Sequence, residues 1–444
     1  MEIIYSLPYL ALIIWLLPKV PFFKNSGLTP FTIRILFSLK AITGIGLILI
    51  YTYYYPTGSS DIFNYFKDGK VLHSALAHSP SDYFRMLLGI NDQSPHLMYY
   101  YDQMSFWLKE FNYDMFNDNR TVIRFNAIVM LFSFKNIFVH TYIMNVLAIT
   151  GLIGIYRFLT STFKFNRVIV LISIALPPSL LFWGSGLLKE GIVLFALGIL
   201  VFGLTQLSNN SKSIRPYITL SFALLIFSVS KFYVLLAISP AMISFFINKK
   251  VQKPLLIYSI VHLILYGSIF LLPIIDAFPN IPQIIANKQN DFINFVHSLS
   301  HVGSYIETPR LTSNILDFTW QGIRGFFVTL FRPHIFEAHN FAALPAAMEN
   351  MLTIGLIAII PFFRNKQIKT TYLFFGIAFT IILFALAGMT TTVLGALVRY
   401  KIPAQPFFYA TLLMCINWNA ILDKIGYKPN LTKIQAAVFT TSSS

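Results

Sequence analysis

Long apolar runs alternate with short polar segments along most of the chain. A membrane-spanning helix needs about 20 mostly apolar residues to cross roughly 30 Å of hydrocarbon. On that basis the sequence predicts eleven spans, at residues 3–18, 31–55, 136–156, 168–184, 187–207, 217–230, 232–248, 254–273, 345–363, 370–390 and 404–422. The pattern predicts an all-α, polytopic bundle of transmembrane helices that forms a single integral-membrane domain over residues 1–444.

The apolar stretch 217–247 is long enough for one tilted helix, but Lys231 interrupts it. Basic residues flank the stretch on both sides, with Arg215 before it and Lys249 and Lys250 after it. Cytoplasmic loops are enriched in Lys and Arg, so both flanks are predicted to be cytoplasmic. An even number of crossings follows, with two helices that meet near Lys231.

The distribution of basic residues orients the bundle. With the N-terminus outside, the loops at 19–30, 157–167, 208–216, 248–253 and 364–369 and the C-terminal tail all lie inside. These segments contain one acid, Asp423, and sixteen bases: Lys19, Lys24, Arg157, Lys164, Arg167, Lys212, Arg215, Lys249, Lys250, Lys253, Arg364, Lys366, Lys369, Lys424, Lys428 and Lys433. We expect a multi-pass protein of the inner (cytoplasmic) membrane with its C-terminus in the cytoplasm. The first apolar stretch lacks a basic n-region and a cleavage site, so it is predicted to be a retained helix.

Two long segments, 56–135 and 274–344, are predicted to be extracytoplasmic loops with short interfacial helices. The first is too polar and acidic to lie in lipid. The second ends in a short apolar segment, 323–336, that carries Arg324 and Arg332, which is typical of an interfacial or re-entrant helix.

Composition excludes the soluble classes of protein. Hydrophobic residues make up 56% of the chain and charged residues 11%, against roughly 25% charged in globular proteins. A net charge of +16 would indicate nucleic-acid binding in a soluble protein, but here it belongs to the cytoplasmic loops, and no nucleic-acid partner is expected. Cys415 is the one cysteine, which excludes an intramolecular disulfide and a cysteine-based metal site.

The first candidate site is Ser-Ser-Asp-Ile-Phe-Asn-Tyr at residues 59–65, after the second predicted helix. A carboxylate that is partly desolvated at the mouth of a cavity has a raised pKa and can act as a general base. Asp61 is therefore the candidate catalytic residue. The structural alternative is a helix N-cap formed by Ser59, Ser60 or Asp61.

The second is Pro-Pro-Ser-Leu-Leu-Phe-Trp-Gly-Ser-Gly-Leu-Leu-Lys-Glu at residues 177–190. The prolines end one helix, and Ser185 or Gly186 is predicted to begin the next. The N–H groups of that helix start and the Lys189 ammonium would attract a phosphate, with Glu190 as the balancing charge. The alternative is a local Lys189–Glu190 pair.

The third is Phe-Arg-Pro-His-Ile-Phe-Glu-Ala-His-Asn at residues 331–340. The fork of donors on Arg332 matches phosphate or carboxylate, whereas a structural pair between Arg332 and Glu337 is the alternative. His334, Glu337 and His339 have a spacing that matches no established ligand motif, so no metal site is predicted.

The fourth is Arg-Tyr-Lys-Ile-Pro at residues 399–403, which is predicted to begin the last helix. Arg399 and Tyr400 are candidate ligand-binding residues, and the alternative is that Arg399 reaches the lipid headgroups. All four segments are predicted on the outer face, together with Glu349 at the start of the ninth helix, which indicates one outward-facing cavity. Lys40 is expected to reach toward the cytoplasm and is left out of this site.

These features resemble the polytopic glycosyltransferases of the GT-C type, which use polyprenyl-phosphate-linked sugars. The chain shares their many helices, a long outer loop with an early aspartate, Asp61, and a late Arg-Tyr-x-x-Pro pattern at 399–403. The segment at 177–190 is similar to one in bacterial surface-polysaccharide proteins. In GT-C enzymes the acidic loop usually follows the first helix, whereas here it follows the second.

The resemblance implies a transferase that takes a sugar from a lipid-linked donor on the extracytoplasmic face, in surface-polysaccharide or glycoconjugate synthesis. Asp61 would accept the proton of the acceptor hydroxyl. The substrate-binding residues would be Lys189, Glu190, Arg332, Glu337, Arg399 and Tyr400. The lipid-linked donor and membrane lipids are the expected partners; no cofactor is predicted, and a need for a divalent metal stays open.

Two other functions are compatible with the sequence. An O-antigen or exopolysaccharide polymerase also has many spans, two large outer loops and a need for a phosphate clamp and a base. A transporter or lipid flippase without catalysis would instead show an inverted repeat and charges at the membrane midplane. The sequence shows no internal repeat.

Overall fold

The computed structural model describes residues 2–55, 60–108, 117–208, 213–275, 277–298, 304–338, 343–368, 370–426 and 437–440. Within these residues the regular structure is helical, and β pairing is limited to isolated bridges such as the one between Leu28 and Phe439. The predicted all-α class is confirmed. Some residues used in the predictions lie outside the described residues, namely Ser59, Lys212, His339, Asn340, Lys369, Lys428 and Lys433.

The chain forms two compact units, each described by itself. Unit 1 comprises Met1–Phe158, Leu181–Phe232 and Pro429–Ser444, and unit 2 comprises Leu159–Leu180 and Tyr233–Lys428.

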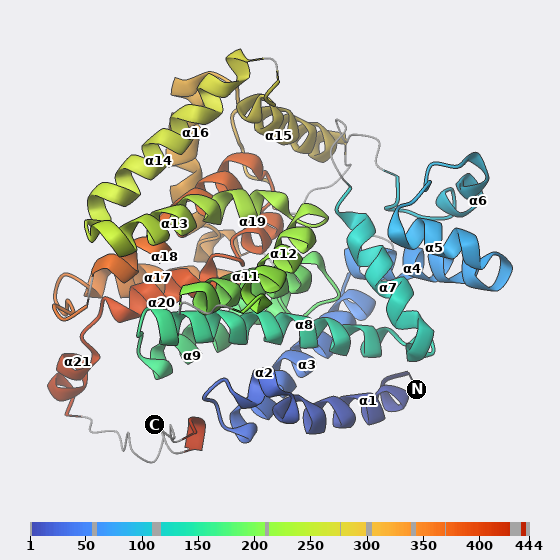
Figure 1. Ribbon diagram of the computed structural model, residues 1–444, viewed down its shortest axis with the longest axis horizontal. Coiled ribbons are helices and arrows are strands. Elements are labelled where there is room, and N and C mark those ends of the chain that lie inside the picture. The colour runs from blue at the N-terminus through green and yellow to red at the C-terminus, as the bar shows by residue number, and fades with distance from the viewer. Residues whose placement is uncertain are drawn as a thin grey trace. The chain divides into compact units, whose positions relative to one another are not determined.

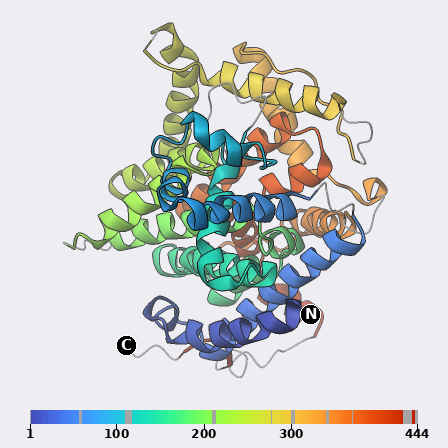
Figure 2. The same cartoon turned by 90° about the vertical axis from the view of Figure 1, so that its right-hand side faces the viewer.

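Unit 1 contains ten α-helices of the described chain. They are α1 (Glu2–Leu16), α2 (Pro21–Lys24), α3 (Pro30–Tyr53), α4 (Asp61–His78), α5 (Pro80–Leu88), α6 (Met98–Tyr101), α7 (Asn119–Ser133), α8 (Ile137–Arg157), α11 (Lys189–Ser208) and α12 (Arg215–Ser228). α8 lies along α11, and α11 lies along α12 (Figure 1). α1 packs against α3 and α8, and α4 packs against α5 and α7 (Figures 1 and 2).

Glycines bring α8 and α11 close together. A Cβ on Gly198 of α11 would overlap the backbone of Gly151 in α8, and a Cβ on Gly154 would lie 2.5 Å from the Gly198 oxygen. Small residues let helix backbones approach in this way in membranes, where packing drives association. Both helices are largely buried by their neighbours. In the most apolar 18-residue stretch of each, 78% of Ile137–Thr162 and 67% of Lys189–Ser208 are buried.

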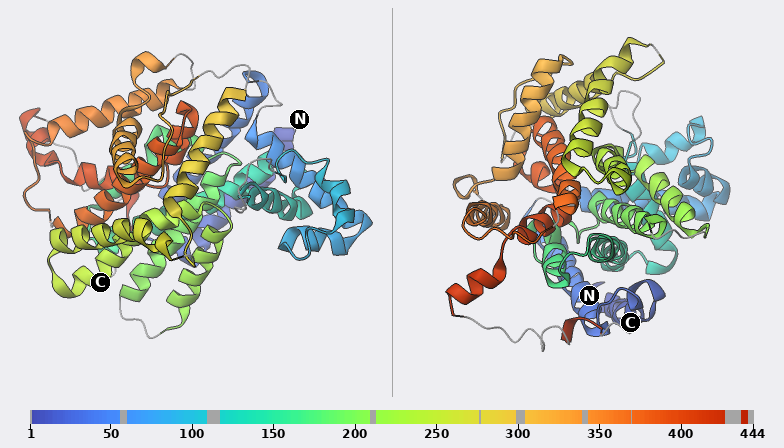
Figure 3. Two further views of the ribbon diagram at one scale, coloured as in Figure 1. Left: turned by 90° about the horizontal axis from the view of Figure 1, so that it is seen from above. Right: turned by 60° about the vertical axis from the view of Figure 1, so that its left-hand side comes forward.

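Unit 2 has its own helices. They are α9 (Arg167–Ala175), α14 (Pro254–Leu271), α15 (Ile281–Ser298), α16 (Ile315–Phe331), α17 (Leu344–Ile359), α18 (Thr370–Thr390), α19 (Leu394–Tyr400), α20 (Gln405–Met414), α21 (Trp418–Lys424) and all but the first residue of α13 (Phe232–Val251). α10 (Pro178–Trp183) begins in unit 2. α18 packs along α16 and also contacts α20, and Figure 3 gives two further views of these helices.

Gln289 of α15 connects the second loop region to α18. Its Nε2 donates to the carbonyls of Pro309 at 2.9 Å and Met389 at 2.8 Å, and its Oε1 accepts the N–H of Leu311 at 2.7 Å. The side chain is fully buried and hydrogen-bonded at both ends. The segment around Pro309 and Leu311 is therefore attached to the helical core of unit 2.

Seven helices of the described chain are long and apolar enough to cross a membrane: Glu2–Lys19, Pro30–Tyr53, Ile137–Thr162, Lys189–Ser208, Phe232–Val251, Pro254–Ile274 and Leu373–Thr390. They coincide with seven of the eleven predicted spans. The other four predicted spans hold shorter helices. α12 and α17 are continuous, with 14 and 16 residues, whereas 168–184 and 404–422 are each divided into two helices. The Pro177–Pro178 pair lies at the division between α9 and α10, where proline removes a backbone donor.

The predicted interruption of 217–247 is confirmed. α12 ends at Ser228 and α13 begins at Phe232, so Lys231 lies in the connection between them.

Candidate functional site

A buried carboxylate, Glu349, lies at the centre of a polar cluster in unit 2. Its Oε2 accepts the N–H of Ser179 at 2.6 Å, and its Oε1 accepts Gln405 Nε2 at 2.6 Å and the Tyr409 hydroxyl at 3.0 Å. Glu349 is 3% exposed. Because three donors, the Ser179 N–H and two side chains of α20, converge on it, hydrogen bonds rather than water satisfy this carboxylate.

A lysine lies beside this carboxylate. Lys401 is 3% exposed, and its Nζ donates to Asn350 Oδ1 at 2.7 Å. Asn350 follows Glu349 on α17, and its Nδ2 donates to the carbonyl of Pro333 at 2.9 Å. Burial lowers the pKa of Lys401, whereas the negative charge of Glu349 raises it.

Arg332 and Glu337 form the structural pair that the sequence left as an alternative. Arg332 follows α16, and its Nη2 contacts Glu337 Oε1. Glu337 Oε2 also accepts the N–H of His334 at 3.1 Å and lies 3.4 Å from His334 Nε2. Partial burial opposes ionisation of Glu337, but the Arg332 and His334 contacts outweigh it and hold the pKa of this carboxyl below its usual value.

Three of the four predicted segments therefore meet in unit 2. Ser179 comes from the segment at 177–190, Arg332 and Pro333 from that at 331–340, and Lys401 from that at 399–403. Glu349 and Asn350 of α17 connect them. Glu349 was noted in the sequence, but neither it nor Asn350, Lys401 or Gln405 was predicted as a ligand-binding residue. The sequence could have pointed to these residues, because polar side chains inside apolar helices are costly to bury and mark functional sites.

Unit 1 contains a second set of buried charges at the start of α11. Lys189 Nζ lies 2.7 Å from Asp118 Oδ1, and Lys231 Nζ lies 2.9 Å from Glu190 Oε1. The side chains of Lys231 and Glu190 are 6% and 1% exposed. α11 begins at Lys189 rather than at Ser185 or Gly186, so the helix start is one turn later than predicted.

Lys40 does not extend to a surface of unit 1, as the expected snorkelling requires. Its side chain is buried in unit 1, and its Nζ donates to Ser185 Oγ at 3.1 Å. Asn145 of α8 donates to the Ser185 carbonyl at 3.1 Å. The expectation was wrong because Ser185 supplies a buried acceptor for the amine.

The first loop region is held together by backbone and ion-pair contacts. Asp68 of α4 accepts the N–H groups of Ser105 and Phe106 at 2.9 and 2.8 Å. Burial raises the pKa of Asp68, although these two hydrogen bonds oppose the rise. Asp68 is thus a structural carboxylate.

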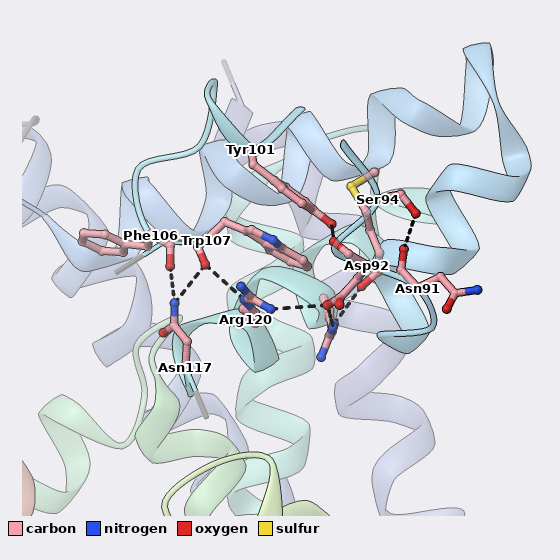
Figure 4. Close-up of polar contacts among 10 residues, drawn as sticks. Asn91, Asp92, Ser94, Tyr101, Phe106, Trp107, Asn117 and Arg120 are labelled. Carbon is pink, nitrogen blue, oxygen red and sulfur yellow. Dashed lines mark hydrogen bonds and ion pairs between the residues drawn. The ribbon is translucent and has the colours of Figure 1, made fainter. Parts of the chain in front are cut away.

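A second cluster in the same region surrounds Trp107 (Figure 4). Arg120 donates to the Trp107 carbonyl at 3.1 Å and lies 3.3 Å from Asp92 Oδ2, while Arg124 lies 3.4 Å from the same oxygen. Tyr101 stacks on the Trp107 ring at 5.1 Å between centroids. Burial raises the pKa of Tyr101 to about 12. These contacts hold the first loop region in a fixed conformation.

The predicted catalytic and binding residues divide between the units. Asp61, Lys189 and Glu190 belong to unit 1, and Arg332, Glu337, Arg399 and Tyr400 belong to unit 2. Asp61 is the first residue of α4 and is partly buried, and Ser60 occupies the N-cap position without a side-chain capping bond. The shared cavity of all four segments stays a prediction.

Arg399 and Tyr400 are not at the start of the last helix. They form the last turn of the short helix α19, and α20 begins only at Gln405. The prediction was wrong because Ile402–Ala404 form a tight turn, with the Ala404 N–H donating to the Lys401 carbonyl at 3.1 Å. Tyr400 packs near Tyr233, with 6.3 Å between ring centroids.

Within the described part of the chain, no group of three or more His, Cys, Asp or Glu side chains is arranged to hold a metal ion. Comparison of the chain with family models, with curated proteins and with solved structures gives no match.

Proposed function

We propose that this protein is an integral-membrane glycosyltransferase that uses a polyprenyl-phosphate-linked sugar on the extracytoplasmic face of the inner membrane. The proposal includes the eleven-span topology with the N-terminus outside. The observation that carries it is the convergence of three polar segments, distant in sequence, on Glu349 and Asn350 in unit 2. A helical membrane protein that buries so many polar groups in one place uses them for binding or chemistry.

The proposed reaction is a displacement at the anomeric carbon of the donor. The acceptor hydroxyl oxygen bonds to that carbon, the bond from the carbon to the phosphate oxygen breaks, and the lipid phosphate leaves with the electron pair. Asp61 takes the proton of the acceptor hydroxyl. Arg332 and Arg399 of unit 2 stabilise the charge that develops on the leaving phosphate. A lipid-linked donor is favoured because nucleotide sugars are made on the opposite side of the membrane.

The test is sugar transfer by the full chain in liposomes. A panel of polyprenyl-phosphate sugars is supplied, and the released polyprenyl phosphate and the glycosylated acceptor are quantified by mass spectrometry. Asp61→Asn should lower the rate by about 10²- to 10⁴-fold because it removes the base at nearly constant shape. Arg399→Lys should also be slow, since the bidentate fork is lost while the charge is kept.

The matched control is Asp102→Asn, which changes an exposed acid of the same loop region and should leave the rate unchanged. Asp68→Asn is a poor control because Asp68 holds two backbone N–H groups. The proposal is wrong if the wild-type chain transfers no sugar from any donor. Joining of lipid-linked oligosaccharides would identify a polymerase instead, and movement of the donor between leaflets without bond cleavage would identify a flippase.

A further inference from the structure

Two oxygen atoms beside Glu349 are buried and have no hydrogen-bond partner within the part of the chain that the structure describes. They are Ser179 Oγ and Gln405 Oε1, and the two residues are 3% and 1% exposed. Ser179 donates to the Glu349 carboxylate with its backbone N–H, and Gln405 donates with its Nε2, at 2.6 Å in each case. Covalent geometry therefore keeps both oxygens within about 6 Å of that carboxylate.

The atoms that lack a partner here are acceptors. Because Gln405 Nε2 donates to Glu349, the amide orientation is fixed, and the atom without a partner is the oxygen. The Ser179 hydroxyl also offers lone pairs. Glu349 Oε2 accepts one hydrogen bond from the described residues, although a carboxylate oxygen has room for two. Buried oxygens of this kind require a donor or a cation.

Glu349 has no cation in direct contact among the described residues. No Lys, Arg or His nitrogen of that part of the chain lies within ion-pair distance of its oxygens. Lys401 acts on Glu349 through space, and its Nζ donates instead to Asn350 at 2.7 Å. A buried carboxylate without a contacting positive charge is costly, so a cation beside it would be stabilising.

The helices are interrupted on both sides of this carboxylate. α9 ends at Ala175 and α10 begins at Pro178, next to Ser179, whereas α19 ends at Tyr400 and α20 begins at Gln405. Both interruptions lie in or beside predicted spans. Irregular backbone at membrane depth is tolerated where it is buried in protein or lines a cavity, and interrupted membrane helices are a recurrent setting for bound Na⁺.

We propose that unit 2 binds one Na⁺ ion between Glu349 Oε2, Ser179 Oγ and Gln405 Oε1, with each oxygen contacting the ion directly or through a retained water. Hard cations prefer oxygen ligands, and these residues offer a carboxylate, a hydroxyl and an amide carbonyl. A monovalent ion fits because one carboxylate, with Lys401 nearby, supplies too little negative charge for a divalent ion. This inference is independent of sugar transfer and goes beyond the proposed function.

The test measures binding of radiolabelled Na⁺ to the full chain in detergent, together with thermal unfolding in NaCl and in choline chloride at equal ionic strength. The wild-type chain should bind Na⁺, and NaCl should raise its unfolding midpoint by about 2 to 4 °C over choline chloride. Ser179→Ala removes the hydroxyl and keeps the N–H that donates to Glu349. This variant should bind Na⁺ about tenfold more weakly, with an unchanged or higher midpoint in choline chloride.

Ser244→Ala is the matched control, because it removes another buried hydroxyl of unit 2 that has no partner among the described residues and should leave Na⁺ binding unchanged. Glu349→Gln should abolish Na⁺ binding, and Ser179→Ala keeps the inference testable if Glu349→Gln fails to fold. The inference is overturned if the wild type binds no Na⁺, if a folded Ser179→Ala variant binds it equally well, or if equimolar Mg²⁺ or Ca²⁺ displaces it. A chain that binds Na⁺ but transfers no sugar would refute the proposed function alone.

Discussion

Two neighbouring side chains at the start of α11 contact different parts of unit 1. Lys189 contacts Asp118, just before α7, and Glu190 contacts Lys231, just after α12. Successive positions on a helix face different directions, which is why adjacent charges of opposite sign find separate partners. The local Lys189–Glu190 pair that the sequence left as an alternative therefore does not describe these ion pairs, which each side chain makes with a distant residue.

Removal of one partner of the buried Lys231–Glu190 pair should destabilise the fold. Glu190→Gln and Lys231→Met should each cost about 3 to 5 kcal/mol, because the remaining charge is left buried and uncompensated. The double variant should cost less than the sum of the two. Unfolding in detergent, followed by circular dichroism, measures these changes, with the exposed Glu307→Gln as a control within about 0.5 kcal/mol of wild type. Additive costs would show that the two side chains act independently.

Asp68 offers a second prediction at the residue scale. Asp68→Ala leaves the N–H groups of Ser105 and Phe106 without their acceptor, so we expect a loss of about 2 to 5 kcal/mol. Protease digestion of the folded protein should then begin earlier near residues 102–108. Digestion at the wild-type rate would contradict the structural role given to this carboxylate.

At the scale of elements, close helix contacts depend on glycine. Gly151 and Gly198 bring α8 and α11 together in unit 1, and Gly325 and Gly388 do the same for α16 and α18 in unit 2. In each pair a Cβ would meet backbone atoms, which cannot move aside as a flexible side chain can. Helix association by close backbone approach is thus common to both units.

Gly198→Ala should destabilise unit 1, by about 1 to 3 kcal/mol, because an added methyl group forces α8 and α11 apart. Gly267→Ala is the matched control, since a Cβ at this position of α14 meets nothing within 4 Å. Alanine has the higher helix propensity, so this control should be neutral or stabilising by up to about 1 kcal/mol. The midpoints of thermal unfolding of the two variants are compared. Equal changes in stability would show that the close approach of α8 and α11 is unimportant.

At the scale of the whole molecule, the sixteen basic residues assigned to the cytoplasmic segments predict a defined topology. Alkaline phosphatase fused after Lys250 or after the C-terminal tail should be inactive, because the enzyme is active only after export. Fusions after Asp102 and after Tyr305, in the two outer loops, should be active. Activity at Lys250 or at the tail would refute the orientation and, with it, an outer-face reaction.

The sequence by itself determined the helical, membrane-spanning character of this protein. Apolar windows about 20 residues long leave the backbone few alternatives to helix in a bilayer, and seven predicted spans coincide with helices of that kind. The break at Lys231 was also predictable, because a charged residue within an apolar stretch and basic residues on both flanks are local signals.

The tertiary structure decided which polar residues meet. Lys189 pairs with Asp118, Lys40 with Ser185, and Lys401 with Asn350, and each partner is distant in the sequence. No periodicity or spacing encodes such pairs, since they depend on how helices pack side by side. The short helices around Ile402 likewise depended on turn geometry that hydropathy does not register, whereas the helix end before Pro177 was predicted from the two prolines. Sequence could therefore select the segments that carry polar chemistry, whereas packing decided that Glu349 and Asn350 of α17 connect three of them.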